Sequence, residues 1–284
     1  EPDSAANRLK DLPRTLATEI INRRLSILAK QENAPFIGGR AGVQEGFDLF
    51  REASIDLTCK ADQWSAALGV ADQELRRALE HGFQPAELHE VVANYLNDLE
   101  QAVKTAPTRH SSGIANEIAD TLNDREVFTA PADNLALFKP ALEKITVDDC
   151  AAALRAAWAT DHRNVLVAGN ARIAADAVAT ITSTYEHSLA VPVAAPVATS
   201  DLAWAYTHFG APGRVVKREH VDDLDLDLIT FANGVRLDLK KTPFEAGVIR
   251  LNARVGNGTL TEPAGERGLA ALTSAVFDAG GLGR

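Results

Sequence analysis

The chain has 284 residues, which predicts one or two domains at about 150 residues each. Hydrophobic residues make up 46% and charged residues 24%, so the composition is that of an ordinary globular protein rather than a disordered or collagen-like one. The 29 basic and 39 acidic residues leave a net charge of −10, which argues against nucleic-acid binding because that function gathers Lys and Arg on one face. No segment has the roughly 18 unbroken apolar residues of a membrane span, so we expect a soluble protein, cytoplasmic or periplasmic.

Cysteine and methionine usage gives two further indications. Cys59 and Cys150 are the only cysteines, too few for a disulfide scaffold, and no CxxC spacing is present to form a cysteine zinc site. The sequence has no methionine and starts Glu1-Pro2-Asp3. We interpret this as a chain that was processed, excised from a larger protein or written without its methionines.

The first part of the chain predicts a helix followed by a β-hairpin. Apolar residues recur at helical spacing over residues 16–28. Over residues 53–59 apolar and polar side chains alternate, which is typical of a half-buried strand. The glycine-rich residues 36–50 precede this strand and are its expected hairpin partner.

Further helices are predicted downstream. Asp62 is the expected cap of a helix over residues 64–81, and a second helix is expected from Pro85 to Val103. Weaker helical patterns cover residues 112–122, 133–137 and 147–158, and a short apolar strand is expected at 164–168. Together these elements predict an α+β fold, with an antiparallel sheet covered by helices on one face.

The pattern changes after residue 188. Proline and glycine interrupt an Ala/Val-rich stretch up to about residue 214, which indicates an extended linker. Strands are then expected on both sides of an Asn233-Gly234 hairpin turn, over residues 224–230 and 235–239, with another strand at 249–255. A helix is expected to open at 268–277. This second domain is too short to complete a core, so we expect a truncated C-terminus.

No candidate for chemistry stands on its own. Asp223-x-Asp225-x-Asp227 lacks the Gly and Glu that a calcium loop needs. His81 and His89 do not share a helical face, and Cys59 lies on the apolar side of a strand. Two glycine-rich segments, Gly256-Asn257-Gly258 and Gly280-Gly281-x-Gly283, lack the arrangement that binds phosphate. We therefore predict no catalytic, cofactor-binding or metal-binding residue in this chain.

The later segments carry a family resemblance. Residues 231–237, Lys240-Lys241-Thr242 and residues 254–260 look like the opening of a repeat unit in the pitrilysin/insulinase family of zinc metallopeptidases. The helical part is matched by Arg76-Arg77-Ala78-Leu79-Glu80-His81-Gly82-Phe83. Catalytic units of the family carry HxxEH on the next helix, where two His bind zinc and the Glu activates water. In this chain Ala271 and Ala275 stand at the His positions and Ser274 at the Glu position.

The resemblance implies an internal, non-catalytic fragment with a degenerate active site. Family members have four related α+β units in two halves of a clamshell. Residues 1–200 would be the complete second unit, residues 201–228 the linker between halves, and residues 229–284 the start of the third unit. Zinc is expected only in the missing N-terminal unit, and the expected partners are the other units of the same polypeptide and the peptides that it degrades.

Three functions are consistent with this sequence. The first is a non-catalytic part of the substrate chamber of a zinc-dependent metalloendopeptidase. The second is a part of a non-enzymatic clamshell protein used for interaction or assembly. The third is an unrelated α+β binding domain whose match at residues 231–260 is accidental.

Overall fold

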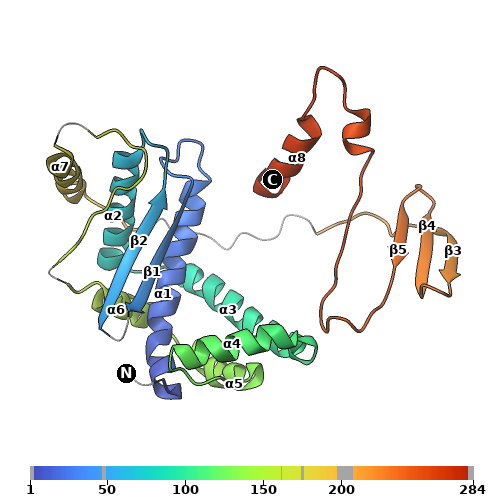
Figure 1. The fold of residues 1–284 in the computed structure, drawn as a ribbon, viewed down its shortest axis with the longest axis horizontal. Helices are drawn as coiled ribbons and strands as arrows, with labels where there is room; N and C mark the ends of the chain where they lie inside the picture. Colours follow the sequence, from blue (N-terminus) through green and yellow to red (C-terminus); the bar gives the residue numbers. More distant parts are fainter. Residues whose placement is uncertain (1–2, 47–48, 161, 174–175, 197–206, 281–284) are drawn as a thin grey trace. The chain divides into compact units, whose positions relative to one another are not determined.

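The computed structural model describes residues 3–46, 49–160, 162–173, 176–196 and 207–280, and the chain divides into two compact units (Figure 1). The first, Glu1–Asp201, contains α1 (Ala5–Ala29), β1 (Gly38–Gly46), β2 (Phe50–Thr58), α2 (Trp64–His81), α3 (Pro85–Thr105), the 3₁₀ turn η1 (Ala106–Thr108), α4 (Ser111–Asn123), α5 (Pro131–Leu142), α6 (Val147–Ala157) and α7 (Ala177–Leu189). The second, Leu202–Arg284, contains β3 (Val215–Val221), β4 (Leu226–Phe231), β5 (Arg236–Leu239), η2 (Gly258–Thr261) and α8 (Leu269–Gly280). The fold is α+β, as predicted.

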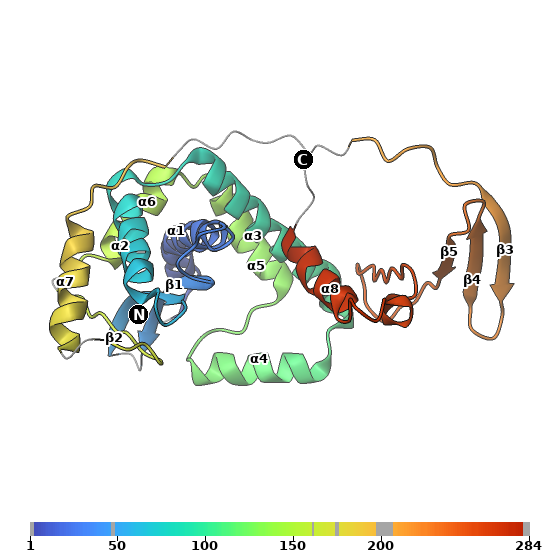
Figure 2. The same cartoon turned by 90° about the horizontal axis from the view of Figure 1, so that it is seen from above.

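Helix α1 forms the centre of the first unit. Its apolar stripe is buried, with Leu16, Ile20 and Leu25 fully inaccessible to solvent. The β-hairpin, α3, α5 and α6 pack around it, and Figure 2 shows α1 nearly end-on in the middle of these elements. Truncating a buried leucine of this stripe to alanine would cost about 2–5 kcal/mol because it removes apolar contacts and leaves a cavity. The burial of α1 is therefore the main source of stability in this unit.

The hairpin β1–β2 covers one side of α1. The strands pair antiparallel in continuous register from Gly38↔Thr58 to Gly46↔Phe50. Ala41 is buried, and Ile55 and Leu57 pack against the same core. The side-chain carbonyl of Asn22 in α1 accepts a hydrogen bond from the Ala41 amide at 2.7 Å, which fixes the hairpin on the helix. These contacts confirm the predicted strand and its glycine-rich partner, with helices on one face of the sheet.

The remaining predicted helices of the first unit are present. In α6, the Thr146 hydroxyl accepts from the Asp149 amide at 3.2 Å and the Asp149 carboxylate accepts from the Thr146 amide at 3.0 Å, so the predicted capping box is formed. The predicted cap of α2 is wrong: the cap position is Gln63 rather than Asp62, and it makes no side-chain capping bond. Among the described residues, no helix is both long and apolar enough to cross a bilayer.

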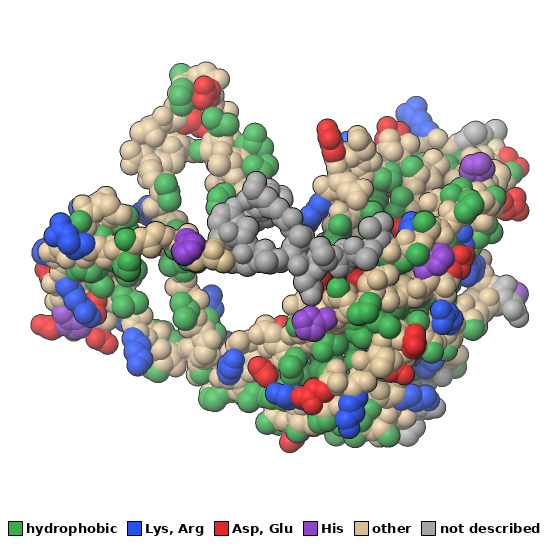
Figure 3. Space-filling view, turned by 180° about the vertical axis from the view of Figure 1, so that it is seen from behind, with side chains coloured by type: hydrophobic (Ala, Val, Ile, Leu, Met, Phe, Trp, Pro, Cys, Tyr) green, Lys and Arg blue, Asp and Glu red, His purple; other side chains and the backbone are tan. Residues whose placement is uncertain are grey.

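The second unit is a three-stranded antiparallel sheet followed by irregular chain and α8. Strand β4 lies between β3 and β5, and Gly234, with φ of +86°, closes the predicted Asn233-Gly234 turn. Left-handed backbone of this kind is readily adopted only by glycine. None of the residues described in this unit is buried, and hydrophobic side chains lie uncovered along it (Figure 3). The helix expected at 268–277 is confirmed as α8.

Two predicted strands are wrong. Residues 164–168 and 249–255 are extended but belong to no strand, and Leu166 and Ile249 are 87% and 95% exposed. A strand needs a neighbouring strand to satisfy its amides and carbonyls, and within the described ranges neither segment is paired. Their apolar composition therefore does not by itself produce a strand.

Two elements were missed by the sequence analysis. Strand β3 lies inside residues 201–228, which were expected to be linker, and its run of four charged or polar residues, Lys217 to His220, hides the strand pattern. It forms because β4 offers a pairing edge, across which Arg218 bonds Asp227 at 2.8 Å. Helix α7 begins with the Asp176 carboxylate accepting from the Ala179 amide, which is an ordinary N-cap signal. The domain limits given above stay predictions.

The two thiols should react very differently with a thiol reagent. Cys150 is fully buried, and burial, aided by the neighbouring Asp149 charge, raises the pKa of its thiol to about 11, whereas Cys59 is partly exposed. Since the thiolate is the reactive form, we expect one fast-reacting thiol at pH 8 in the folded chain and two after unfolding in urea. Cys59→Ser should remove the fast reaction, and rapid modification of Cys150 in the folded chain would contradict the structure.

Candidate functional site

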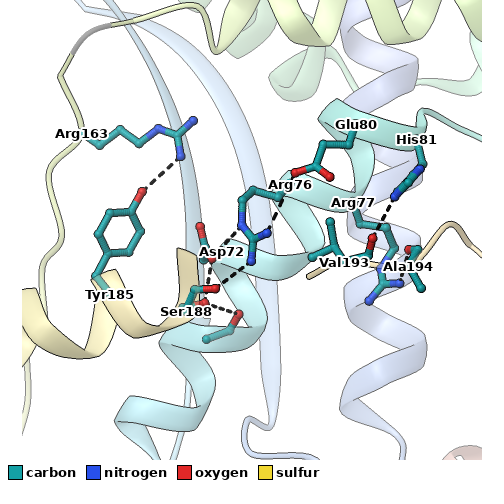
Figure 4. Close-up of polar contacts among 11 residues, drawn as sticks. Asp72, Arg76, Arg77, Glu80, His81, Arg163, Tyr185, Ser188, Val193 and Ala194 are labelled. Atoms are coloured by element: carbon teal, nitrogen blue, oxygen red, sulfur yellow. Dashed lines mark hydrogen bonds and ion pairs between the residues drawn. The ribbon is translucent and has the colours of Figure 1, made fainter. Parts of the chain in front are cut away.

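The most extensive polar cluster of the first unit ties the C-terminal half of α2 to the end of α7 and to the segment that follows it. We call this cluster the α2–α7 clasp, and it consists of Asp72, Arg76, Arg77 and His81 on α2, Ser188 at the end of α7, and the backbone carbonyls of Val193 and Ala194. Figure 4 shows the side chains of α2 directed at the segment from α7 onward.

The first half of the clasp is buried. The Ser188 hydroxyl donates to Asp72 Oδ2 at 2.7 Å, and the Asp72 side chain is 1% exposed. Arg76 donates from Nε to the same carboxylate oxygen at 3.1 Å and from Nη2 to the Ser188 carbonyl at 2.8 Å. A buried carboxylate is costly unless it is paired, so Arg76 provides the countercharge that Asp72 requires. The other carboxylate oxygen, Oδ1, is buried without a hydrogen-bond partner.

The second half of the clasp lies at the surface. Arg77 Nη1 donates to the Ala194 carbonyl at 2.6 Å, and its Nε donates to Glu74 at 3.0 Å. His81 Nε2 lies 2.9 Å from the Val193 carbonyl, a contact in which the ring nitrogen is the donor. Asp72 and Arg77 are five residues apart and so point to different sides of α2. The segment from Ser188 to Ala194 therefore crosses the helix and is held on both sides of it.

A second network joins α1 to the corner between α2 and α3. The nearly buried Arg24 donates from Nε and Nη2 to the two carboxylate oxygens of Glu87 at 2.6 and 2.7 Å, and from Nη2 to the Gly82 carbonyl at 3.1 Å. Its guanidinium also lies 5.3 Å from the centre of the Phe83 ring. Glu87 in turn accepts from the Gln84 amide at the start of α3. The motif at residues 76–83 that carries the family resemblance is thus a structural joint.

Neither network has the geometry of a catalytic site. The clasp contains Asp, Ser and His, but His81 bonds a backbone carbonyl and Ser188 donates to Asp72, so no base is placed to activate the hydroxyl. Within the described part of the chain, no group of three His, Cys, Asp or Glu side chains could hold a metal ion. What this arrangement does is fix the path of the chain where it leaves α7.

One open cavity of about 330 Å³ lies between α3 and α5. Its lining is mainly apolar and consists of Val103, Ala132, Leu135, Ala136, Lys139, Pro140 and Glu143. Lys139 pairs with Glu100 at 3.4 Å. The lining offers no nucleophile, so this cavity is a contact surface rather than a reaction site.

The structure separates the positions that the sequence analysis considered as ligands. Ala271, Ser274 and Ala275 are exposed on α8, where the Ser274 hydroxyl donates to the Ala270 carbonyl. At the β3–β4 turn, Asp227 accepts from Arg218 and lies 3.2 Å from His220, and its pKa is held below the usual range mainly by Arg218. His89 is exposed on α3.

The other candidates are also apart from one another. Cys59 lies against the core of the first unit. Gly256 and Gly258 have positive φ and form a turn. The second glycine segment, Gly280-Gly281-x-Gly283, extends outside the described residues.

The clasp itself was not predicted as a site. Arg76, Arg77 and His81 were noted for the family resemblance, but no pattern marks Ser188 or Asp72 as partners, because they are 116 residues apart in sequence. A spacing of four between Asp72 and Arg76 on a helix is the one local signal, and it is typical of any surface ion pair.

No family model and no curated protein matches this sequence. Solved structures do match. The periplasmic protease PqqL from Escherichia coli is 19% identical, with a TM-score of 0.56 over 84% of this chain and 27% of that chain. The first half of PqqL is 18% identical, with a TM-score of 0.55 over 68% of this chain and 42% of that one. A predicted insulinase family protease from Yersinia pestis is 16% identical, with a TM-score of 0.53 over 67% of this chain and 41% of that one.

The chain therefore has the fold of a part of an insulinase-type protease. The resemblance predicted from the short motifs is confirmed at the level of fold. The chain spans less than half of each of these proteins.

Removing the Ser188 hydroxyl should weaken the first unit. Ser188→Ala takes a hydrogen bond from a buried carboxylate, and we expect a loss of about 1–3 kcal/mol in the free energy of unfolding. Urea denaturation measures this loss.

Ser183→Ala is the matched control on the same helix, because its exposed hydroxyl donates only to the Thr180 carbonyl. The control should change stability by less than about 0.5 kcal/mol. Equal effects of the two substitutions would show that the buried half of the clasp contributes nothing.

Proposed function

We propose that this chain is a non-catalytic structural part of a zinc-dependent peptidase that degrades peptides. It would supply the second unit, the connection between halves and the start of the third unit, and so form part of the wall of the substrate chamber. The fold likeness to proteases supports this, and the observation that carries it is the matched length. The match covers 68% of this chain against the first half of PqqL and 84% against the whole protease. A chain that crosses from one half into the next would give this difference.

The residues of α8 do not suit a zinc site. Methyl groups at Ala271 and Ala275 cannot bind a metal ion, and the Ser274 hydroxyl is engaged by the Ala270 carbonyl. A serine hydroxyl is also a poor general base at neutral pH. If the complete polypeptide is a peptidase, its zinc and its base belong to a unit outside this chain.

The clasp gives this part a mechanical role. It holds the segment from Ser188 to Ala194 against α2 through four hydrogen bonds. A chamber that opens to admit a peptide needs a rigid wall and a connection that bends. In our proposal the wall is the first unit, and bending between the halves begins after Ala194, beyond the last bond of the clasp.

The complete coding sequence and a cleavage assay test this proposal. We expect HxxEH upstream of residue 1, and we expect the complete polypeptide to cleave unstructured peptides until a chelator is added. Replacing the Glu of that motif by Gln should abolish cleavage. The 284-residue chain alone should cleave nothing and hold no stoichiometric zinc by elemental analysis.

Two results would overturn the proposal. Chelator-sensitive cleavage by the 284-residue chain alone would mean that it carries its own active site. A complete polypeptide without HxxEH and without peptidase activity would instead favour a clamshell protein for interaction or assembly.

A further inference from the structure

Helix α4 is the one helix of the first unit that is amphipathic and yet has no buried residue. Ile114, Ile118 and Leu122 recur every four residues, so they form one apolar stripe. Leu122 is 70% exposed and Ile118 is 37% exposed. Figure 2 shows the backbone of α4 standing apart from α3 and α5, joined to them only through its flanking loops.

The chain after α4 is held in place while its apolar side chains stay uncovered. The Asp3 carboxylate accepts from the Val127 amide at 2.8 Å, and Arg8 donates to the Val127 carbonyl at 2.7 Å and to the Thr129 hydroxyl at 2.8 Å. Arg8 and Asp3 also pair with each other, which holds the pKa of the Asp3 carboxyl below its usual range. Nevertheless Val127 and Phe128 are 56% and 39% exposed. Their exposure therefore does not come from an unattached loop.

The other end of α4 is also fixed. It follows η1 directly after α3, and Arg109 before the helix pairs with Glu117 within it. A helix tied at both ends that keeps its apolar stripe uncovered presents a preformed contact surface. We define the α4 face as Ile114, Ile118, Leu122, Val127 and Phe128.

The charge around the α4 face is acidic. Residues 111–128 contain four carboxylates, on Glu117, Asp120, Asp124 and Glu126, and a single basic side chain, on Arg125. A partner that covers the apolar stripe would bring its own flanking charges next to these carboxylates. Like charges there would oppose binding, and opposite charges would favour it and speed association. The charge distribution therefore selects a basic partner.

We propose that the α4 face docks a basic amphipathic helix of a partner protein, with its Leu and Ile side chains on the stripe of α4 and its Lys and Arg side chains beside the carboxylates. A helix of similar length matches the 13 residues of α4, which extend about 20 Å along the helix axis. Helix packing through i, i+4 rows is the common way to bury such a stripe. This surface is separate from the clasp and needs no catalytic activity.

A binding titration with the 284-residue chain tests the proposal. The probe is a labelled helical peptide of about 15 residues, with Leu and Ile on one face and Lys along both edges. A second peptide keeps the apolar face and carries Glu in place of Lys. Fluorescence anisotropy should detect binding of the Lys peptide, no binding of the Glu peptide, and weaker binding as sodium chloride is raised.

Variants locate the binding site. Leu122→Ser should weaken binding of the Lys peptide about tenfold or more, because it removes apolar area from the contact. The matched control is Leu166→Ser, which changes an equally exposed leucine of the first unit outside α4 and should leave binding unchanged. The combined change Asp120→Asn, Asp124→Asn and Glu126→Gln should weaken binding and reduce its dependence on salt. Circular dichroism should be the same for all variants.

Three results would overturn the proposal. The first is equal binding of the Lys and Glu peptides, or binding that Leu122→Ser does not change. The second is a lower unfolding midpoint for Leu122→Ser than for Leu166→Ser, because the face would then be covered within the chain. The third is a dimer that Leu122→Ser converts to a monomer in light scattering, since the occupant would then be a second copy of this chain.

Discussion

The burial of a single stripe of α1 is the constraint on which the first unit depends. The hairpin, α3, α5 and α6 all contact that helix, and the buried residues of the hairpin and of α6 belong to the same core cluster. A two-stranded hairpin is at best marginally stable on its own, so β1 and β2 rely on α1 for their existence. The bond from the Ala41 amide to Asn22 adds direction to this packing, because it sets where the hairpin lies along the helix.

Polar contacts decide how the chain enters and leaves this core. Arg24 orients the corner between α2 and α3, Arg8 and Asp3 fix the segment before α5, and the clasp fixes the segment after α7. Each joins residues far apart in sequence through a charged group with at least two partners. Charge-assisted bonds of this kind are more directional than apolar contacts, which suits the anchoring of irregular chain. In the proposed peptidase they would keep the chamber wall rigid while the connection beyond it bends.

The sequence predicted elements whose stability is local, and failed where pairing is long-range. The helices over α2, α3 and α6 and the Asn233-Gly234 turn follow from periodicity and capping, and they are present. The strand at 249–255 was wrong because apolar composition does not provide a partner, whereas β3 was missed because its partner strand outweighs a charged sequence. The contact of Ser188 with Asp72 could not be predicted, since it depends on where α7 packs. The fold resemblance was accessible because turn and joint motifs are short and local.

The bond from Arg24 to Gly82 has a consequence for how the first unit unfolds. It spans 58 residues and connects the centre of α1 to a helix end, so the corner between α2 and α3 cannot open while α1 stays in place without exposing a nearly buried cation. These three helices should therefore gain and lose hydrogen-exchange protection together, as one cooperative block. Helix α4, which has no buried residue, should exchange its amides far faster by separate local opening. The first unit thus combines a slowly exchanging interior with one rapidly exchanging helix on its surface.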